Sequence, residues 1–211
     1  MKTMIKKILI LCLILLQGIT SSAMTPEQKK TVLNKISTAA AALPSMTCDF
    51  TQTKKVSLVK ETMTSQGKMY YKKPDKLRWE YTSPYTYTFI FNGTKVSVKN
   101  SKKKSVIDTQ SNKVFKEVAR IMMNTVTGKA LNNPADFKTD VAEGSSGWLV
   151  TLIPKRKDMK SMFNKIIITF RKTDCMVTEI QIYEKNGDSS TIKLKNVKSS
   201  VHVDDTLFSI H

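Results

Sequence analysis

The sequence predicts a mainly β protein in which antiparallel strands form an incomplete, strongly curved barrel that helices cover. Three observations lead to this fold class. Apolar and polar residues alternate with a period of two through most of the chain after Pro44. Asn92-Gly93 and Asn186-Gly187 are typical of tight hairpin turns, and each lies between two alternating runs. One helix-spaced apolar stripe precedes Pro44, and a helix with one apolar face is expected to lie against a sheet.

The beginning of the chain has the pattern of a secretory signal peptide. Three lysines precede an apolar run at 8–16, and the small residues Ser21 and Ala23 follow it. The apolar run is too short to cross a bilayer, which takes roughly 20 residues. We therefore expect residues 1–23 to be removed after Ala23 and residues 24–211 to form a single exported domain in the periplasm.

The chain is strongly basic, with 35 Lys and Arg against 17 Asp and Glu and a net charge of +18. In a cytosolic protein this charge would indicate binding to nucleic acid. An exported protein meets little nucleic acid, so no nucleic-acid partner is expected. Membrane surfaces, acidic headgroups or an acidic protein are the remaining anionic partners. A lysine-rich surface that only interacts with solvent is an equally good explanation.

The first helix of the exported chain has clear boundary signals. Thr25 is a candidate N-cap, Pro26 stands at the first helical position, and Gln28 completes a capping box. Pro44 ends the helix. The apolar residues that recur at helical spacing between these signals are Val32, Leu33, Ile36, Ala40 and Leu43.

After this helix, period-two alternation predicts up to ten strands, interrupted by one helical segment and one loop. A sheet of this size must curl, and a curled sheet can enclose a cavity. The helical segment is expected near 115–123 and the loop at 124–133. The predicted strands cover about 46–59, 67–73, 77–81, 85–91, 94–99, 148–153, 165–170, 176–183, 190–197 and 207–210.

The sequence carries little that points to catalysis, and we expect a non-enzymatic protein without cofactor or metal. The two histidines, His202 and His211, lie in the last ten residues, and no nucleophile-elbow, zinc or phosphate-loop motif is present. His202 could join Asp204 and Asp205 in a weak metal site, although exposed polar residues near a terminus explain them better. Cys48 and Cys175 are the cysteines of the exported chain, and the sequence leaves open whether they pair.

The chain is rich in flexible and aromatic apolar side chains. Six aromatic residues fall within 79–91, and the chain has 11 methionines, which suit surfaces that accept varied apolar shapes. Composition alone is compatible with an ordinary packed core and with a lined cavity.

The segment G-K-M-Y-Y-K-K-P-D-K-L-R-W-E-Y-T-S-P at 67–84 resembles the signature of the periplasmic outer-membrane lipoprotein carrier family, LolA. The F-T-Q at 50–52, the L-I-P-K at 152–155 and the Leu-Phe at 207–208 are similar to that family in order and spacing. The resemblance covers nearly the whole exported chain. It implies an incomplete barrel whose helices form a lid over an apolar cavity.

The same resemblance implies a function and partners. A protein of this family takes lipid-modified proteins from an ATP-driven exporter of the inner membrane and shields their acyl chains in the periplasm. It then delivers them to an acceptor or membrane surface at the outer membrane. We expect such a carrier to act as a monomer.

The resemblance and the strand alternation together imply which residues contact acyl chains. Trp79 and Tyr71 are the leading candidates. The full expected set is Phe50, Met69, Tyr71, Leu77, Trp79, Tyr81, Phe89, Phe91, Phe115, Met122 and Met123. Lys73 occupies the position where the family usually has an arginine that latches the lid by bonding to helix carbonyls. Lysine keeps the charge there but loses the planar, forked guanidinium.

Two other functions remain open at this point. A lipid or glycolipid shuttle, or a lipoprotein sensor, could use the same fold, and the basic charge would suit an anionic glycolipid. An exported hydrolase with an unrecognised site is the alternative from a different class. A polar, titratable cluster inside the cleft would indicate the hydrolase, and an apolar cleft would indicate a carrier.

Overall fold

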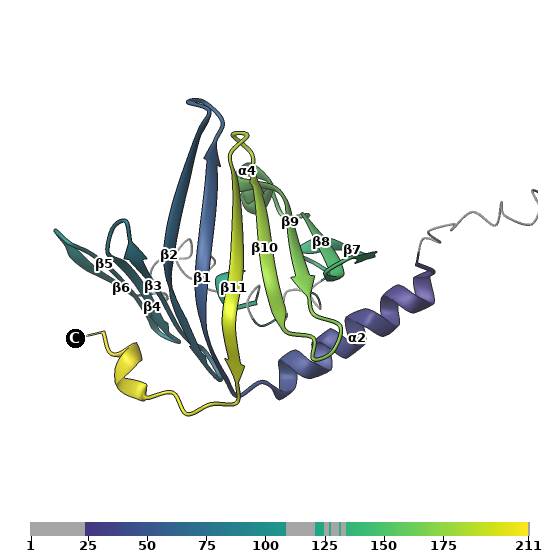
Figure 1. Ribbon diagram of the computed structural model, residues 1–211, viewed down its shortest axis with the longest axis horizontal. Helices are drawn as coiled ribbons and strands as arrows, with labels where there is room; N and C mark the ends of the chain where they lie inside the picture. Colours follow the sequence, from purple (N-terminus) through teal and green to yellow (C-terminus); the bar gives the residue numbers. More distant parts are fainter. Residues whose placement is uncertain (1–23, 109–120, 125–126, 128–130, 132–133, 211) are drawn as a thin grey trace, which may run out of the picture.

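The computed structural model describes residues 24–108, 121–124, 127, 131 and 134–210. Helix α2 (Pro26–Ala42) begins as its sequence predicts: the Thr25 hydroxyl accepts from the Gln28 N–H at 3.3 Å, and the Thr25 N–H donates to the Gln28 side chain at 2.8 Å. Figure 1 shows α2 running along one end of the sheet, and an ion pair of 2.6 Å joins Lys29 to Asp140 on β7. The buried stripe of α2 consists of Val32, Ile36 and Ala40.

The strands of the described residues form one 11-stranded antiparallel sheet in the order β6-β5-β4-β3-β2-β1-β11-β10-β9-β8-β7. The strands are β1 (Ser45–Val56), β2 (Glu61–Lys72), β3 (Lys76–Ser83), β4 (Tyr87–Asn92), β5 (Lys95–Asn100), β6 (Lys104–Asp108), β7 (Phe137–Gly144), β8 (Gly147–Pro154), β9 (Phe163–Phe170), β10 (Val177–Glu184) and β11 (Ser189–Ser199).

The sheet is curved and open, which confirms the predicted fold class. Pairing of β1 with β11 joins the two halves of the chain at the centre, whereas β6 and β7 are the two edges and do not pair with each other. Figure 1 shows both flanks curling behind the long central strands. Two of the hairpins turn at Gly93 and Gly187, whose φ angles of 92° and 91° suit the predicted Asn-Gly turns.

Several element predictions were wrong or incomplete. Strands β6 and β7 were not expected, because β6 follows a run of lysines and β7 carries few apolar residues, as expected at sheet edges. Helix α4 (Lys157–Met162) is too short to show a helical period. No helix in the described part of the chain has the length and hydrophobicity needed to span a bilayer.

The expected last strand at 207–210 is also wrong. Residues Asp205–Phe208 form the short 3-10 helix η2, whose first N–H groups are capped by Asp204: its carboxylate accepts from the Thr206 N–H at 2.8 Å. Phe208 packs with Ile90 and Val203 in a small second cluster on the outer face of the sheet.

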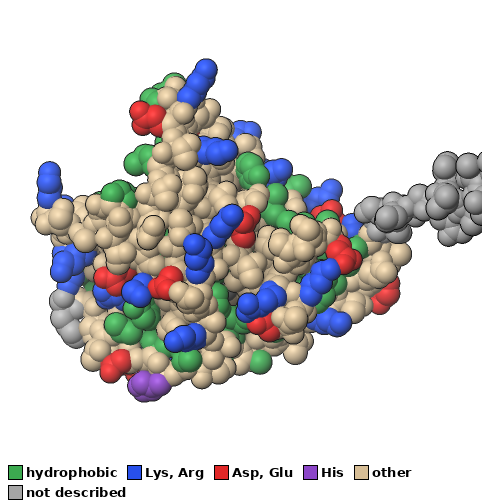
Figure 2. All heavy atoms as spheres, in the orientation of Figure 1, with side chains coloured by type: hydrophobic (Ala, Val, Ile, Leu, Met, Phe, Trp, Pro, Cys, Tyr) green, Lys and Arg blue, Asp and Glu red, His purple; other side chains and the backbone are tan. Residues whose placement is uncertain are grey.

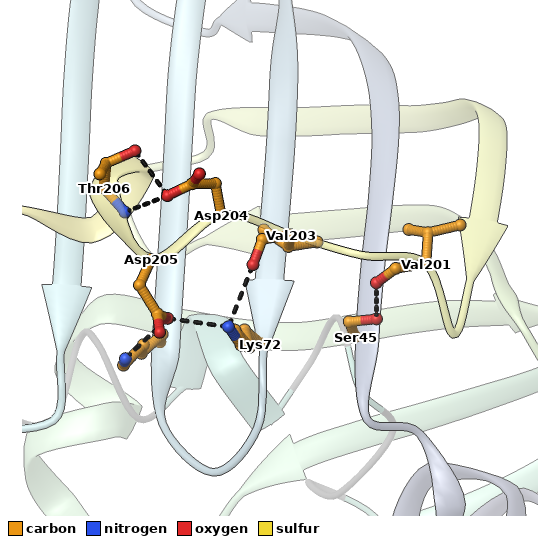
Figure 3. A network of polar contacts seen from close by, with 8 residues as sticks. Ser45, Lys72, Val201, Val203, Asp204, Asp205 and Thr206 are labelled. Carbon is orange, nitrogen blue, oxygen red and sulfur yellow. Dashed lines mark hydrogen bonds and ion pairs between the residues drawn. The ribbon is translucent and has the colours of Figure 1, made fainter.

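A polar network fastens this C-terminal segment to the first strands (Figure 3). The Ser45 hydroxyl donates to the Val201 carbonyl at 2.5 Å, and Lys72 Nζ donates to the Val203 carbonyl at 3.0 Å. Asp205 accepts from both Lys72 and Lys76 at 2.9 Å. Asp204 and Asp205 were considered above as weak metal ligands. In the structure Asp204 caps η2, and Asp205 forms ion pairs with Lys72 and Lys76.

Candidate functional site

The inner face of the sheet encloses a cavity of about 290 Å³. Side chains from β1, β3, β9, β10 and β11 form its walls, and helical residues 121–122 contribute a further side. The lining residues are Gln52, Lys54, Trp79, Tyr81, Ile121, Met122, Phe163, Ile166, Ile180, Ile182, Glu184, Ser190 and Ile192. Most of them are apolar, as the carrier interpretation requires and a hydrolytic cleft does not.

Aromatic rings build the wall on the β1–β3 side. The Phe50 ring lies 4.5 Å from the Trp79 ring and 5.1 Å from the Tyr81 ring, centroid to centroid, the second pair edge to face. The Tyr81 hydroxyl donates to Gln52 Oε1 at 2.5 Å. Burial raises the pKa of Tyr81 to about 12, so the phenol stays neutral and keeps donating at neutral pH.

Two charged side chains stand at the end of the cavity nearest the hairpin turns. Lys54 lies 3.3 Å from Glu184 and 3.4 Å from Asp188. Partial burial acts to lower the pKa of Lys54, but the ion pairs outweigh it and raise that pKa. The backbone N–H of Ser57 and then Lys54 hold the pKa of Asp188 below its usual value. Lys54 is thus shared between two carboxylates, and the three side chains form an ion-pair cluster at the rim of the cavity.

One buried donor beside the cavity lacks a well-aligned acceptor. Trp79 is only 4% exposed, and its Nε1 is near enough to the Tyr81 oxygen to act to lower the pKa of that phenol, but it does not reach full hydrogen-bond geometry. An unsatisfied buried donor costs roughly 1–3 kcal/mol. Because this nitrogen is itself buried, Trp79 contributes the apolar part of its ring to the cavity lining and not its N–H.

The structure distributes the predicted contact residues between the cavity wall and the packed core. Trp79, Tyr81 and Met122 line the cavity. Phe115 lies outside the described residues, and Phe91 is half-buried against the core. The remaining candidates are buried core residues that do not line the cavity: Phe50, Met69, Tyr71, Leu77, Phe89 and Met123.

Sequence reasoning missed the wall that the C-terminal strands contribute. Its residues are Phe163, Ile166, Ile180, Ile182 and Ile192. Alternation marks Ile180 and Ile182 as neighbours on one face of a strand, so a signal was present. The signal does not say that this face meets Trp79, because that depends on the pairing of β1 with β11.

Lys73 contacts the helix that follows the expected signal peptide. Its Nζ donates to the Ala41 carbonyl in the last turn of α2 at 2.9 Å, and its backbone N–H donates to the Pro44 carbonyl at 2.8 Å. Helix α2 has no basic residue of its own in that turn. Lys73 therefore supplies the cation that a helix C-terminus favours.

The two cysteines whose pairing the sequence left open are free thiols in the structure. Cys48 is buried and Cys175 is half-buried. Burial, followed by the neighbouring Asp49 charge, raises the pKa of Cys48 to about 12. A thiol that stays protonated is a weak nucleophile, so Cys48 acts as a small apolar core residue.

Known proteins are similar to this chain over most of its length. An outer-membrane lipoprotein carrier protein of Legionella pneumophila strain Lens is 24% identical over 170 residues, which cover 81% of this chain and 80% of the relative. A protein of the same name from Francisella tularensis subsp. novicida is 26% identical over 164 residues, 78% of this chain and 76% of the relative.

Solved structures share the fold at much lower identity. The crystal structure of MucB superposes with a TM-score of 0.53 at 6% identity, covering 87% of this chain and 62% of MucB. An uncharacterized conserved protein from Thermus thermophilus superposes with a TM-score of 0.51 at 10% identity, covering 84% of this chain and 91% of that protein. The family model described as outer membrane lipoprotein carrier protein LolA matches residues 41–211, and the chain therefore belongs to the LolA family.

Proposed function

We propose that this protein is a periplasmic carrier that binds the acyl chains of lipid-modified proteins in the cavity between Trp79 and Ile182. The observation that carries the proposal is the largely apolar cavity itself, whose charged residues are confined to its rim. Membership of the LolA family and the similarity to the outer-membrane lipoprotein carrier proteins of Legionella and Francisella support it.

The physical need for such a cavity is large. Burial of one CH₂ group stabilises by about 0.8 kcal/mol, so a sixteen-carbon chain exposed to water costs on the order of 12 kcal/mol. Transfer of that chain from a bilayer into an apolar cavity is close to neutral, because both surroundings are hydrocarbon-like. A carrier therefore needs a lined cavity and a way to open it, and it needs no covalent chemistry.

The size of the cavity implies that it widens when it is loaded. Its volume of about 290 Å³ lies at the lower end of the roughly 300–1,000 Å³ that ligand pockets occupy. Ile121 and Met122 lie on a separate helical segment, whereas the other lining residues lie on hydrogen-bonded strands or directly at their ends. We infer that this segment and α2 together form the lid, and that Lys73 helps to latch the closed state through its bond to α2.

The route of the cargo follows from the same proposal. The protein would be exported through the signal peptide at 1–23, cut after Ala23, and would receive lipoproteins from an inner-membrane ATP-driven exporter. It would release them at the outer membrane. Mass spectrometry of the protein isolated from the periplasm would give the mature N-terminus and, in the same sample, the bound cargo.

Displacement of a hydrophobic fluorescent probe by a diacylated peptide tests acyl binding directly. Ile182→Glu places a carboxylate on the cavity wall and should weaken binding by about tenfold or more, because a charge there must be desolvated. Ile153→Glu is the matched control, since Ile153 is 44% exposed and does not line the cavity. Equal affinities in both variants and the parent would exclude this cavity as the acyl site.

The same experiment separates the two kinds of acylated cargo. An anionic glycolipid would present acyl chains to the same walls, and the basic charge of the protein favours it. Displacement by glycolipid but not by diacylated peptide would assign the protein as a glycolipid shuttle. The mass of the species that co-purifies with it provides an independent answer.

A further inference from the structure

The turn between β1 and β2 exposes large apolar side chains at the tip of a projecting hairpin. Leu58 is 92% exposed, Val59 is 55% exposed, and Met63, three residues beyond the turn, is 49% exposed. Figure 2 shows the projection rising from the body of the molecule, with hydrophobic, basic and acidic side chains near its tip. Three of the six most exposed large hydrophobic residues of the described chain thus lie within one short segment.

Lysines surround these apolar side chains. Lys55 and Lys60 flank the turn and are exposed, whereas Lys54, behind it, is already paired with Glu184 and Asp188. Glu61 is the acidic residue of this segment. An apolar tip with a basic collar has the composition of a surface that enters the headgroup region of an anionic bilayer.

The hairpin is held in place by its neighbour. The Ser57 N–H donates to Asp188 Oδ1 at 2.9 Å, and Lys54 lies 3.4 Å from the other oxygen of the same carboxylate. Asp188 lies in the turn between β10 and β11, directly after Gly187. The turn at 57–60, which carries Leu58 and Val59, is thus hydrogen-bonded through Ser57 to a second turn, and this bond fixes the base of the apolar tip.

One exposed apolar residue of the hairpin, Met63, lies on the same face of the sheet as the cavity. Met63 pairs with Lys54 across β1 and β2, and opposite residues of an antiparallel pair share one face of the sheet. Lys54 lines the cavity, so Met63 lies on the cavity side of the hairpin. The rim residues Lys54 and Glu184 stand at the strand ends nearest the turns. Their side chains are 36% and 28% exposed, whereas Ile180 and Trp79, farther from the turns, are buried. We infer that the mouth of the cavity faces the same end of the molecule as the hairpin.

We propose that the tip of the β1–β2 hairpin, Leu58 and Val59 between Lys55 and Lys60, inserts into the headgroup region of an anionic lipid bilayer. This contact brings the mouth of the cavity to the membrane surface, where acyl chains enter or leave. The inference deepens the proposed carrier function by naming the element that meets the membrane. Membrane contact by the hairpin does not itself depend on cargo in the cavity.

Flotation with lipid vesicles tests the proposal. The protein should bind vesicles of phosphatidylcholine with phosphatidylglycerol, and Leu58→Ser with Val59→Ser should weaken that binding by at least about tenfold. Lys55→Gln with Lys60→Gln should remove the preference over vesicles of phosphatidylcholine alone. Ile153→Ser is the matched control, because it removes an exposed apolar side chain elsewhere and should bind as the parent does.

Two further readouts keep the outcomes distinct. The Leu58→Ser, Val59→Ser variant should keep the parent affinity for the soluble fluorescent probe, so that a failure of the carrier function and a failure of membrane contact give different results. Sedimentation velocity tests the alternative that the hairpin tip binds a second copy of the chain and not a membrane. The proposal would be overturned if the protein did not bind vesicles, or if the hairpin variant bound them as well as the parent does. It would also be overturned if the parent and the control variant self-associated and the hairpin variant did not.

Discussion

The ring of Phe50 lies across Gly67, its partner on the neighbouring strand, and occupies the space where a side chain would otherwise stand. A Cβ at Gly67 would lie 2.5 Å from Phe50 Cζ and 2.0 Å from the Glu80 carbonyl oxygen. The glycine therefore allows the Phe50 ring to reach Trp79 at 4.5 Å and thereby to support the aromatic wall of the cavity. The first residue of the family-like segment at 67–84 thus has a packing role.

Gly67→Ala should destabilise the protein and disturb this wall. The added methyl group meets a backbone oxygen, which can move only with its strand, so a cost of about 1–3 kcal/mol is expected. Urea unfolding measures the cost, and tryptophan emission in a Trp148→Phe background, where Trp79 is the remaining tryptophan, reports the displacement of Trp79. Gln66→Ala, at the exposed preceding residue, should change stability by less than about 0.5 kcal/mol. Parent-like stability and emission in Gly67→Ala would show that the close contact imposes no constraint.

Lys73→Met should loosen the end of α2. The variant loses the hydrogen bond to the Ala41 carbonyl and the cation at the helix C-terminus, which together stabilise by roughly 0.3–1 kcal/mol at an exposed site. Hydrogen exchange of the amides in the last turn of α2 should become faster.

Lys73→Arg separates the charge from the particular side chain. Arginine can reach the same carbonyl, so exchange in α2 should stay close to that of the parent. If Lys73 latches the lid, release of an acylated peptide to vesicles should be faster in Lys73→Met than in Lys73→Arg. Identical release rates in all three proteins would remove the latch function while leaving the helix contact intact.

Cys48 should make stability sensitive to alkaline pH. Its pKa rises from 9.0 to about 12 in the folded protein, mainly because it is buried. Above pH 9 the unfolded chain therefore loses a proton that the folded chain keeps, and stability falls with rising pH. The slope from this one group approaches about 1.4 kcal/mol per pH unit between the two values.

Urea unfolding in reducing buffer between neutral pH and pH 10.5 measures this slope. Cys48→Ala should show a shallower decline than the parent, although it is less stable overall because of the lost side chain. Cys175→Ala is the comparison, since Cys175 is half-buried and should affect the slope less. A decline that is equal in the parent and in Cys48→Ala would mean that the thiol ionises freely in the folded state.

Features that depend on neighbouring residues could be predicted before the structure. The capping box of Thr25 and Gln28 and the turns at Gly93 and Gly187 rely on contacts within a few residues, and each appears where it was expected. The alternation around Trp79 likewise identified its inward face, because a strand has a period of two whatever it pairs with. The family-like segment at 67–84 implied the same fold class as the alternation and added the expectation of a lid over a cavity.

Features that depend on distant pairing could not be predicted in this way. The sequence by itself determined the capped helix, the hairpins and which faces of many strands are apolar. Only the tertiary structure decided that Ile182 lies across a cavity from Trp79 and that Phe50 lies beneath the wall instead of on it. It also decided that Leu58 projects into solvent. Alternation sorts side chains between two faces, whereas the closure of β1 onto β11 and the curvature of the sheet decide which faces meet.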